Sequence, residues 1–194
     1  PGEAEAQADF YAKSTYNDLE MSIRGMREMV STLAGLPGRK ALLYVSDGLE
    51  MRAGEDLFQL AAKEHPKLQN RGAISLQANR YNARRRYQEL IAQANANRVT
   101  FYTLEAAGLR SHSSLSAERG GGVSTIEVDF TYQMNRQETL LMLADDTGGL
   151  ATISTNNFAG AFDKIARDFG SYYSLGYLPS HSGDGRFHRI EVKV

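Results

Sequence analysis

Three short apolar runs, separated by segments with helical periodicity, constrain the fold of this chain more than any other feature. The first run, residues 41–45, reads Ala-Leu-Leu-Tyr-Val without polar alternation. Such a run is typical of a strand that is covered on both faces, as in a parallel sheet. Residues 99–104 and 150–154 predict two further short strands. Because strands that alternate with helices are joined by right-handed crossovers, the pattern predicts an α/β fold with a parallel sheet and helices on both faces.

The helical segments have recognisable stripes and ends. Apolar residues at spacings of four and three predict a helix over residues 17–34, and a second stripe follows from about residue 82. Asn135, with Glu138 three residues later, resembles a capping box and predicts that the next helix begins there. Gly148 is placed to end that helix in the left-handed conformation. Asn156 or Asn157 can cap a last helix, whose stripe is Phe158, Phe162, Ile165 and Phe169.

The remaining segments predict a hairpin and two polar insertions. Residues 172–178 and 187–194 predict an antiparallel pair of strands, because apolar and charged residues alternate at the C-terminus. Residues 50–80 are polar and irregular, which predicts an insertion with one short helix. Residues 108–135 form the second insertion, and the stretch 110–125 within it predicts a surface loop.

The size and composition fit one domain over residues 1–194 with a proper core. The chain has 194 residues, of which 42% are hydrophobic. The side chains that these predicted elements should bury are Leu42, Tyr44, Phe101, Leu140, Ile153, Phe162, Ile165 and Ile190.

The charge and the absent residue types exclude several classes of function. A formal net charge of -1 offers no global field for nucleic acid, and the basic cluster around Arg84 has the spacing of a solvated helix face. The chain has no cysteine, which excludes disulfides and thiolate sites. No run reaches the roughly 20 apolar residues of a membrane span. The N-terminus does not resemble a signal peptide, so we expect a processed end and a longer natural product.

Motifs for catalysis are also missing. The glycines at 120–122 lack the Lys-Ser or Lys-Thr of a phosphate loop, and no G-x-S-x-G turn occurs. The four histidines show no metal-ligand spacing, and Asp145 and Asp146 fit a solvated turn. We therefore predict that the chain is not an enzyme.

Asp47 is the one carboxylate in a position where ligands bind. It follows the 41–45 strand in Ser-Asp-Gly, and ligands of α/β proteins bind at the carboxyl ends of the strands. One interpretation makes Asp47 a ligand of a divalent cation. The other makes it a turn residue, because Asp and Gly together form a good turn and one carboxylate does not complete a cation site.

Four segments resemble the von Willebrand factor A-related domains of Acidobacteria and their neighbours. They are "LAGLPGRKALLYVSDGL", "ANANRVTFYTLEAAGL", "ETLLMLADDTGGLATISTNNF" and "YYSLGYLPSHSGDGRFHRIEVKV". The resemblance implies a Rossmann-like sheet of von Willebrand A type, protein binding as the function, and an extracytoplasmic or secreted location. It also implies a metal-ion-dependent adhesion site, in which Asp47 matches one ligand position and Thr15 is a loose match to another. The Asp-x-Ser-x-Ser loop of that site is not in this chain, so Mg²⁺ would bind only if residues from outside the chain complete it.

The resemblance further implies that the first strands of the domain are not in this chain. The 41–45 strand would then be an apolar edge, which proteins usually cover. We expect an upstream segment, another protein or a second copy of the chain to cover it. The leading hypothesis is a non-catalytic binding or scaffolding module that belongs to a larger protein or assembly. A metal-dependent hydrolase that uses Asp47, and a purely structural subunit of a complex, are the alternatives.

Overall fold

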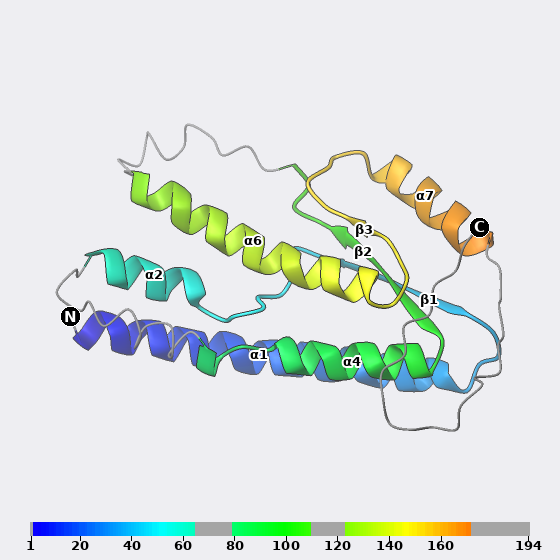
Figure 1. The fold of residues 1–194 in the computed structure, drawn as a ribbon, viewed down its shortest axis with the longest axis horizontal. Coiled ribbons are helices and arrows are strands. Elements are labelled where there is room, and N and C mark those ends of the chain that lie inside the picture. Colours follow the sequence, from blue (N-terminus) through cyan, green and yellow to red (C-terminus); the bar gives the residue numbers. More distant parts are fainter. Residues whose placement is uncertain (1, 65–78, 110–122, 172–194) are drawn as a thin grey trace, which may run out of the picture.

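A three-stranded parallel sheet lies at the centre of the computed structural model, which describes residues 2–64, 79–109 and 123–171 (Figure 1). The strands stand in the order β1 (Lys40–Ser46), β2 (Val99–Glu105) and β3 (Ala151–Thr152). Both neighbouring pairs are parallel. The α/β class and the parallel sheet are therefore confirmed, whereas the predicted pair at 172–178 and 187–194 lies outside the described residues.

Helices cover both faces of this sheet. The register pairs Leu42 with Phe101 and Leu43 with Tyr102, and successive residues of a strand point to opposite faces. Leu42 and Phe101 lie in the main hydrophobic cluster with residues of α1 (Gly2–Ala34) and α4 (Arg84–Ala96). On the opposite face, the Tyr102 hydroxyl donates a 2.6 Å hydrogen bond to Asp168 of α7 (Phe158–Gly170).

Two more helices complete the described fold. α6 (Val123–Asp145) lies on the face of Phe101, because the Thr103 hydroxyl on that side donates to the Leu140 carbonyl at 2.9 Å. α2 (Glu55–Glu64) packs beside both α6 and α1. None of the helices in the described part of the chain combines the length and the apolar character that a membrane crossing needs.

The first helix is much longer than predicted. The sequence stripe indicated a helix over 17–34, but α1 begins at Gly2. Its first half is held by Ala8 and Ala12, which are buried against Phe58 of α2. Small alanines contribute little to an apolar stripe, and this packing partner is distant in sequence. The N-terminal part of the helix was therefore not recognised.

The predicted capping box at Asn135 is wrong. α6 begins at Val123, so Asn135 lies in the middle of the helix and is 2% exposed. The residues 110–125 were predicted to be a loop, but the part from 123 onward is helical. An asparagine within a helix is acceptable here because its amide bonds to the backbone of a different segment, as described below.

The stretch 50–80 is only partly an insertion. It contains the short helix that was predicted, α2, but Met51, Ala53 and Phe58 are fully or almost fully buried. These residues belong to the packed core rather than to an exposed polar insertion. Residues 65–78 lie outside the described part of the chain.

The predicted core is confirmed in part. Leu42, Phe101 and Leu140 are buried, while Tyr44, Ile153 and Ile165 are half-buried. Phe162 is 48% exposed, so its predicted burial is wrong, and Ile190 is outside the described residues. On α7 the buried residue is Ala161, because the helix packs through this small side chain. Asn157 caps α7 as predicted, accepting from the Gly160 N–H at 2.9 Å.

Candidate functional site

The free side of β1 is the feature that stands out as a candidate binding site. β1 is the first strand in the sheet order, and the described residues place no strand on its other side. The Lys40 N–H donates to the Arg98 carbonyl at 2.9 Å, and the Ser46 carbonyl accepts from the Ala106 N–H at 3.0 Å. The backbone N–H and carbonyl groups of the even-numbered residues of β1 therefore point toward β2. Because hydrogen-bonding directions alternate along a strand, the backbone groups of Ala41, Leu43 and Val45 point toward the open edge.

The side chains of the same three residues are also uncovered. Ala41 is exposed, and Leu43 and Val45 are 42% and 51% exposed. They share the sheet face on which α7 covers the neighbouring strand, where Tyr102 is fully buried. The helix thus shields β2 but leaves β1 bare. Between Ala41 and Val45 no charged residue or proline protects the edge, which is unusual for a strand that stays unpaired.

The turn after β1 is fixed by α6. Gly48 has a φ of +86°, and its N–H donates to the Ser46 hydroxyl at 3.1 Å. The Arg136 side chain donates from Nε to the Gly48 carbonyl at 3.0 Å, and a Cβ at Gly48 would lie 2.4 Å from the Arg136 carbonyl oxygen. Only glycine fits this close approach. Asp47 is half-buried at the carboxyl end of β1, where the sequence predicted it.

The described residues do not assemble a cation site around Asp47. Thr15, the second predicted ligand, lies in the interior of α1, next to Tyr16, whose ring packs 5.9 Å from that of Tyr81. No group of three Asp, Glu or His side chains within the described ranges is arranged to hold a metal ion. The described residues therefore supply one candidate ligand at the strand end and not a complete set.

A buried carboxylate that the sequence interpretation missed lies at the ends of β2 and β3. Glu105 is 2% exposed, and both of its oxygens accept from Gln137 Nε2, at 3.1 and 3.0 Å. The backbone N–H of Ser154 donates to Glu105 Oε2 at 2.7 Å. These donors compensate the buried charge and join the loop after β3 to α6. An acidic residue that ends an otherwise apolar strand was the available signal.

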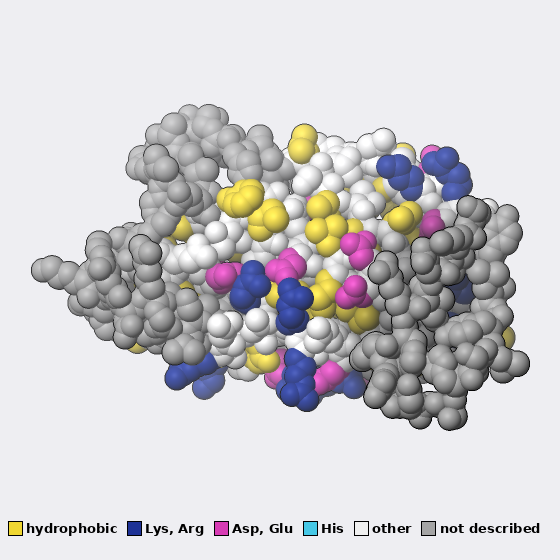
Figure 2. All heavy atoms as spheres, viewed as in Figure 1, with side chains coloured by type: hydrophobic (Ala, Val, Ile, Leu, Met, Phe, Trp, Pro, Cys, Tyr) yellow, Lys and Arg dark blue, Asp and Glu magenta, His cyan; other side chains and the backbone are white. Residues whose placement is uncertain are grey.

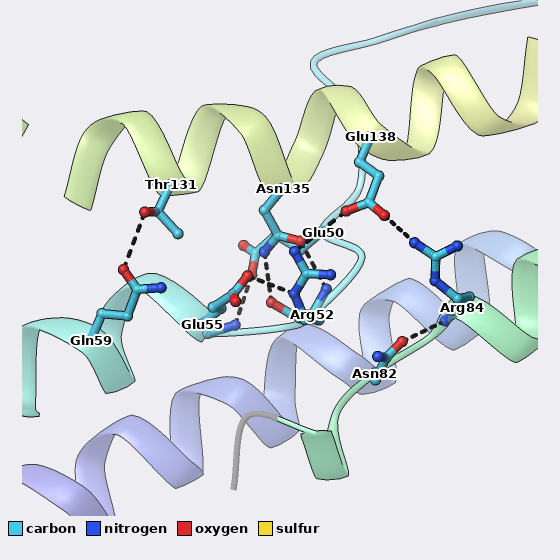
Figure 3. A network of polar contacts seen from close by, with 10 residues as sticks. Glu50, Arg52, Glu55, Gln59, Asn82, Arg84, Thr131, Asn135 and Glu138 are labelled. Carbon is cyan, nitrogen blue, oxygen red and sulfur yellow. Dashed lines mark hydrogen bonds and ion pairs between the residues drawn. The ribbon is translucent and has the colours of Figure 1, made fainter. Parts of the chain in front are cut away.

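Asn135 connects α6 to the segment between β1 and α2 (Figure 3). Its side-chain oxygen accepts from the Arg52 N–H at 2.9 Å, and its amide nitrogen donates to the Arg52 carbonyl at 2.7 Å. The Arg52 side chain pairs with Glu55 at 2.7 Å and with Glu138 at 3.4 Å, and Arg84 also pairs with Glu138. These contacts fix the chain that leaves the Asp47 turn.

A shallow hollow of about 680 Å³ lies beside this network. Its lining includes exposed Phe130 and Met134 together with Arg52, Arg84 and Glu138. Figure 2 shows basic and acidic side chains side by side among hydrophobic ones on this face. Because these charges are paired with one another, they offer no strong field for a charged ligand.

The predicted basic cluster has the same character. Arg85 pairs with Glu89 at 3.3 Å, and Arg86 pairs with Glu20 at 3.1 Å and with Glu89 at 3.6 Å. Tyr87, between them and the sheet, is fully buried in the core. The cluster is therefore an ion-paired helix face, as its spacing predicted.

Two carboxyl groups near the start of α2 have perturbed acidity. Burial raises the pKa of Glu50 above its ordinary value of 4.5, although its carboxylate accepts from the Gly54 N–H at 2.7 Å. Burial likewise raises the pKa of Asp56, one of whose oxygens is buried with no hydrogen-bond partner among the described residues. Neither group belongs to a catalytic motif that the sequence predicts.

No protein-family model, curated protein or solved structure matches this chain. The von Willebrand A resemblance therefore keeps the status of a prediction from the sequence.

Proposed function

We propose that this chain is a non-catalytic protein-binding or scaffolding module of von Willebrand A type, and that the open edge of β1 is its binding element. An extended segment that adds a strand to such an edge gains main-chain hydrogen bonds, and side-chain pockets then provide specificity. The added strand comes from another protein or from a further part of the same polypeptide.

The observation that carries this proposal is the combination of outward backbone groups and bare apolar side chains on one strand. Leu43 and Val45 are both more than two-fifths exposed. Full burial of such side chains contributes about 1.5–3 kcal/mol each. A strand that pairs with β1 therefore satisfies its backbone and covers its side chains in a single contact.

Hydrogen exchange with residue resolution tests the proposal. In a chain shown to be monomeric, we expect the amides of Ala41, Leu43 and Val45 to exchange quickly, because they point away from β2. The amides of Leu42 and Tyr44 serve as the internal control, since they belong to the β1–β2 ladder. Slow exchange of the outward amides in a monomer would show that the edge is already closed, and the proposal would fail.

The second candidate is a metal-dependent hydrolase that uses Asp47, and the position of this residue at the carboxyl end of β1 is what favours it. Isothermal titration with Mg²⁺ and with Mn²⁺ tests whether this chain holds the complete cation site that a hydrolase needs. We expect no saturable binding to this chain, and an Asp47→Asn variant provides the matched control. Tight binding that the substitution abolishes would refute the interpretation of an incomplete site and keep the hydrolase as a candidate.

A further inference from the structure

We propose that the partner of β1 is a second copy of this chain, and that two β1 strands pair antiparallel about a two-fold axis at Leu43. This inference rests on the proposed function, because it names the segment that closes the open edge. Such an interface is isologous, since the same surface is contributed by both copies. It would join the two three-stranded sheets into one continuous sheet.

The backbone geometry of β1 suits this pairing. With Leu43 opposite itself, Ala41 of one copy lies opposite Val45 of the other. In the free strand, the N–H and carbonyl groups of these three residues all point to the open edge, as the alternation from Lys40 and Ser46 requires. They therefore become the hydrogen-bonded pairs of an antiparallel ladder. Every outward group of β1 obtains a partner in both copies.

The side chains of the strand are self-complementary in the same register. On the bare face, Leu43 meets Leu43, and the small Ala41 meets the larger Val45. On the other face, Leu42 of one copy lies opposite Tyr44 of the second. Apolar pairs directly opposite each other in an antiparallel ladder stabilise the sheet.

The charges that flank the strand are also complementary. The register that places Leu43 on the axis places Arg39 opposite Asp47 of the second copy, twice by symmetry. Lys40 lies opposite Ser46, so no like charges meet between residues 39 and 47. Arg39 already lies 3.5 Å from Asp168 in its own copy, and the second copy's carboxylate would add to that ion pair.

This register is also the one that uses the whole strand. β1 spans Lys40–Ser46, and Leu43 is its midpoint. A shift of the axis to Leu42 or Tyr44 leaves residues at both strand ends unpaired and places Arg39 or Asp47 opposite an apolar residue. The longest pairing and the best charge match therefore coincide.

Cysteine cross-linking tests the register, because the natural sequence has no cysteine. Directly opposite hydrogen-bonded residues have Cα atoms about 5.5 Å apart, which fits a disulfide. We expect Leu43→Cys to form a covalent dimer upon mild oxidation. Val45→Cys should not link to itself, because the two positions would lie roughly 14 Å apart at about 3.4 Å per residue. A mixture of Ala41→Cys and Val45→Cys chains should link. Met29→Cys, at a 55% exposed position of α1, is the control for random collision.

Light scattering of the unmodified chain gives the oligomeric state directly. We expect a dimer, and we expect Leu43→Lys to weaken it by roughly tenfold or more, because two lysines would meet on the axis. Met29→Lys makes the same change in charge elsewhere and should leave the dimer intact. Circular dichroism checks that each variant remains folded.

The outcomes separate this inference from the proposed function. A dimer with the expected cross-links supports both. A monomer whose Ala41, Leu43 and Val45 amides exchange quickly overturns the second-copy inference but leaves the open edge available for another partner. A monomer in which these amides are protected overturns both. A dimer that Leu43→Lys does not weaken also overturns the inference, because its interface would lie elsewhere.

Discussion

The contact between Asn135 and Arg52 gives the sharpest test of how this fold positions the turn at Asp47. The Asn135 side chain is 2% exposed and satisfies both the N–H and the carbonyl of Arg52, at 2.9 and 2.7 Å. Asn135→Ala leaves both groups without this partner. A buried backbone group that loses its hydrogen bond costs about 1–3 kcal/mol. Arg52 itself is only partly buried, so water can reach part of the space, and we expect a total loss of about 2–4 kcal/mol.

Urea unfolding followed by circular dichroism measures this change, with the slope of the transition compared between variants. Asn95→Ala is the matched control, because its amide donates a single exposed hydrogen bond, to the Asp146 carbonyl at 2.9 Å. We expect the control to cost less than about 1 kcal/mol. Hydrogen exchange in Asn135→Ala should also accelerate at Arg52 before it does so in β2. A loss below about 1 kcal/mol for Asn135→Ala would refute the claim that this side chain holds the segment.

Three further predictions concern acidity and packing. Burial raises the pKa of Glu50, so its contribution to stability is present below the ordinary value of 4.5 and is lost as the pH rises through the higher folded value. Glu50→Gln should therefore be more stable than the natural chain at neutral pH. Urea titrations at low and at neutral pH should show that this advantage disappears in acid. Burial and the hydrogen bond to Asp168 raise the pKa of Tyr102 to about 12, so Tyr102→Phe should remove one late-titrating phenol from the ultraviolet absorbance curve. Because the same substitution removes the hydrogen bond, it should also destabilise the packing of α7 by about 1–2 kcal/mol. Phe162→Ala should lower the free energy of unfolding by less than about 1.5 kcal/mol because Phe162 is 48% exposed, whereas Phe101→Ala should lower it by about 3–5 kcal/mol. Thermal unfolding compares the two variants. Equal losses would contradict the placement of α7.

An antiparallel second copy and a parallel strand from another segment would place different groups beside Asp47, which decides whether an adhesion site can form there.

 In the antiparallel pairing of two copies, the residue opposite Asp47 is Arg39, a cation that also lies 3.5 Å from Asp168 of its own copy. A parallel strand from another segment would instead bring its own following loop toward Asp47. A cation site at Asp47 therefore depends on which strand pairs with the open edge of β1. The titration with Mg²⁺ measures whether that site is complete.

The local patterns that were recognised correctly were those whose physical cause lies within a few residues. The apolar runs at 41–45 and 99–104 form strands, and the structure confirms both as β1 and β2. β2 is buried on both faces, as such a run predicts, whereas the prediction is wrong for β1, whose odd-numbered residues stay exposed on one face. Gly148 adopts a φ of +72° at the end of α6, and Asn157 caps α7. The position of Asp47 at the carboxyl end of its strand was predicted in the same way.

The sequence alone determined the α/β class, the parallel strands and the turn that carries Asp47, because the periodicity of apolar residues and the conformations of glycine are local properties. The tertiary structure decided the rest. Asn135 is a helix-interior residue because the Arg52 backbone accepts and donates to its amide, and Ala8 and Ala12 extend α1 because Phe58 covers them. Phe162 is exposed although it lies on an apolar stripe, because the neighbouring Ala161 is the residue that packs. That β1 is an edge strand is likewise fixed by the strand order, a relation between segments that are far apart in the chain.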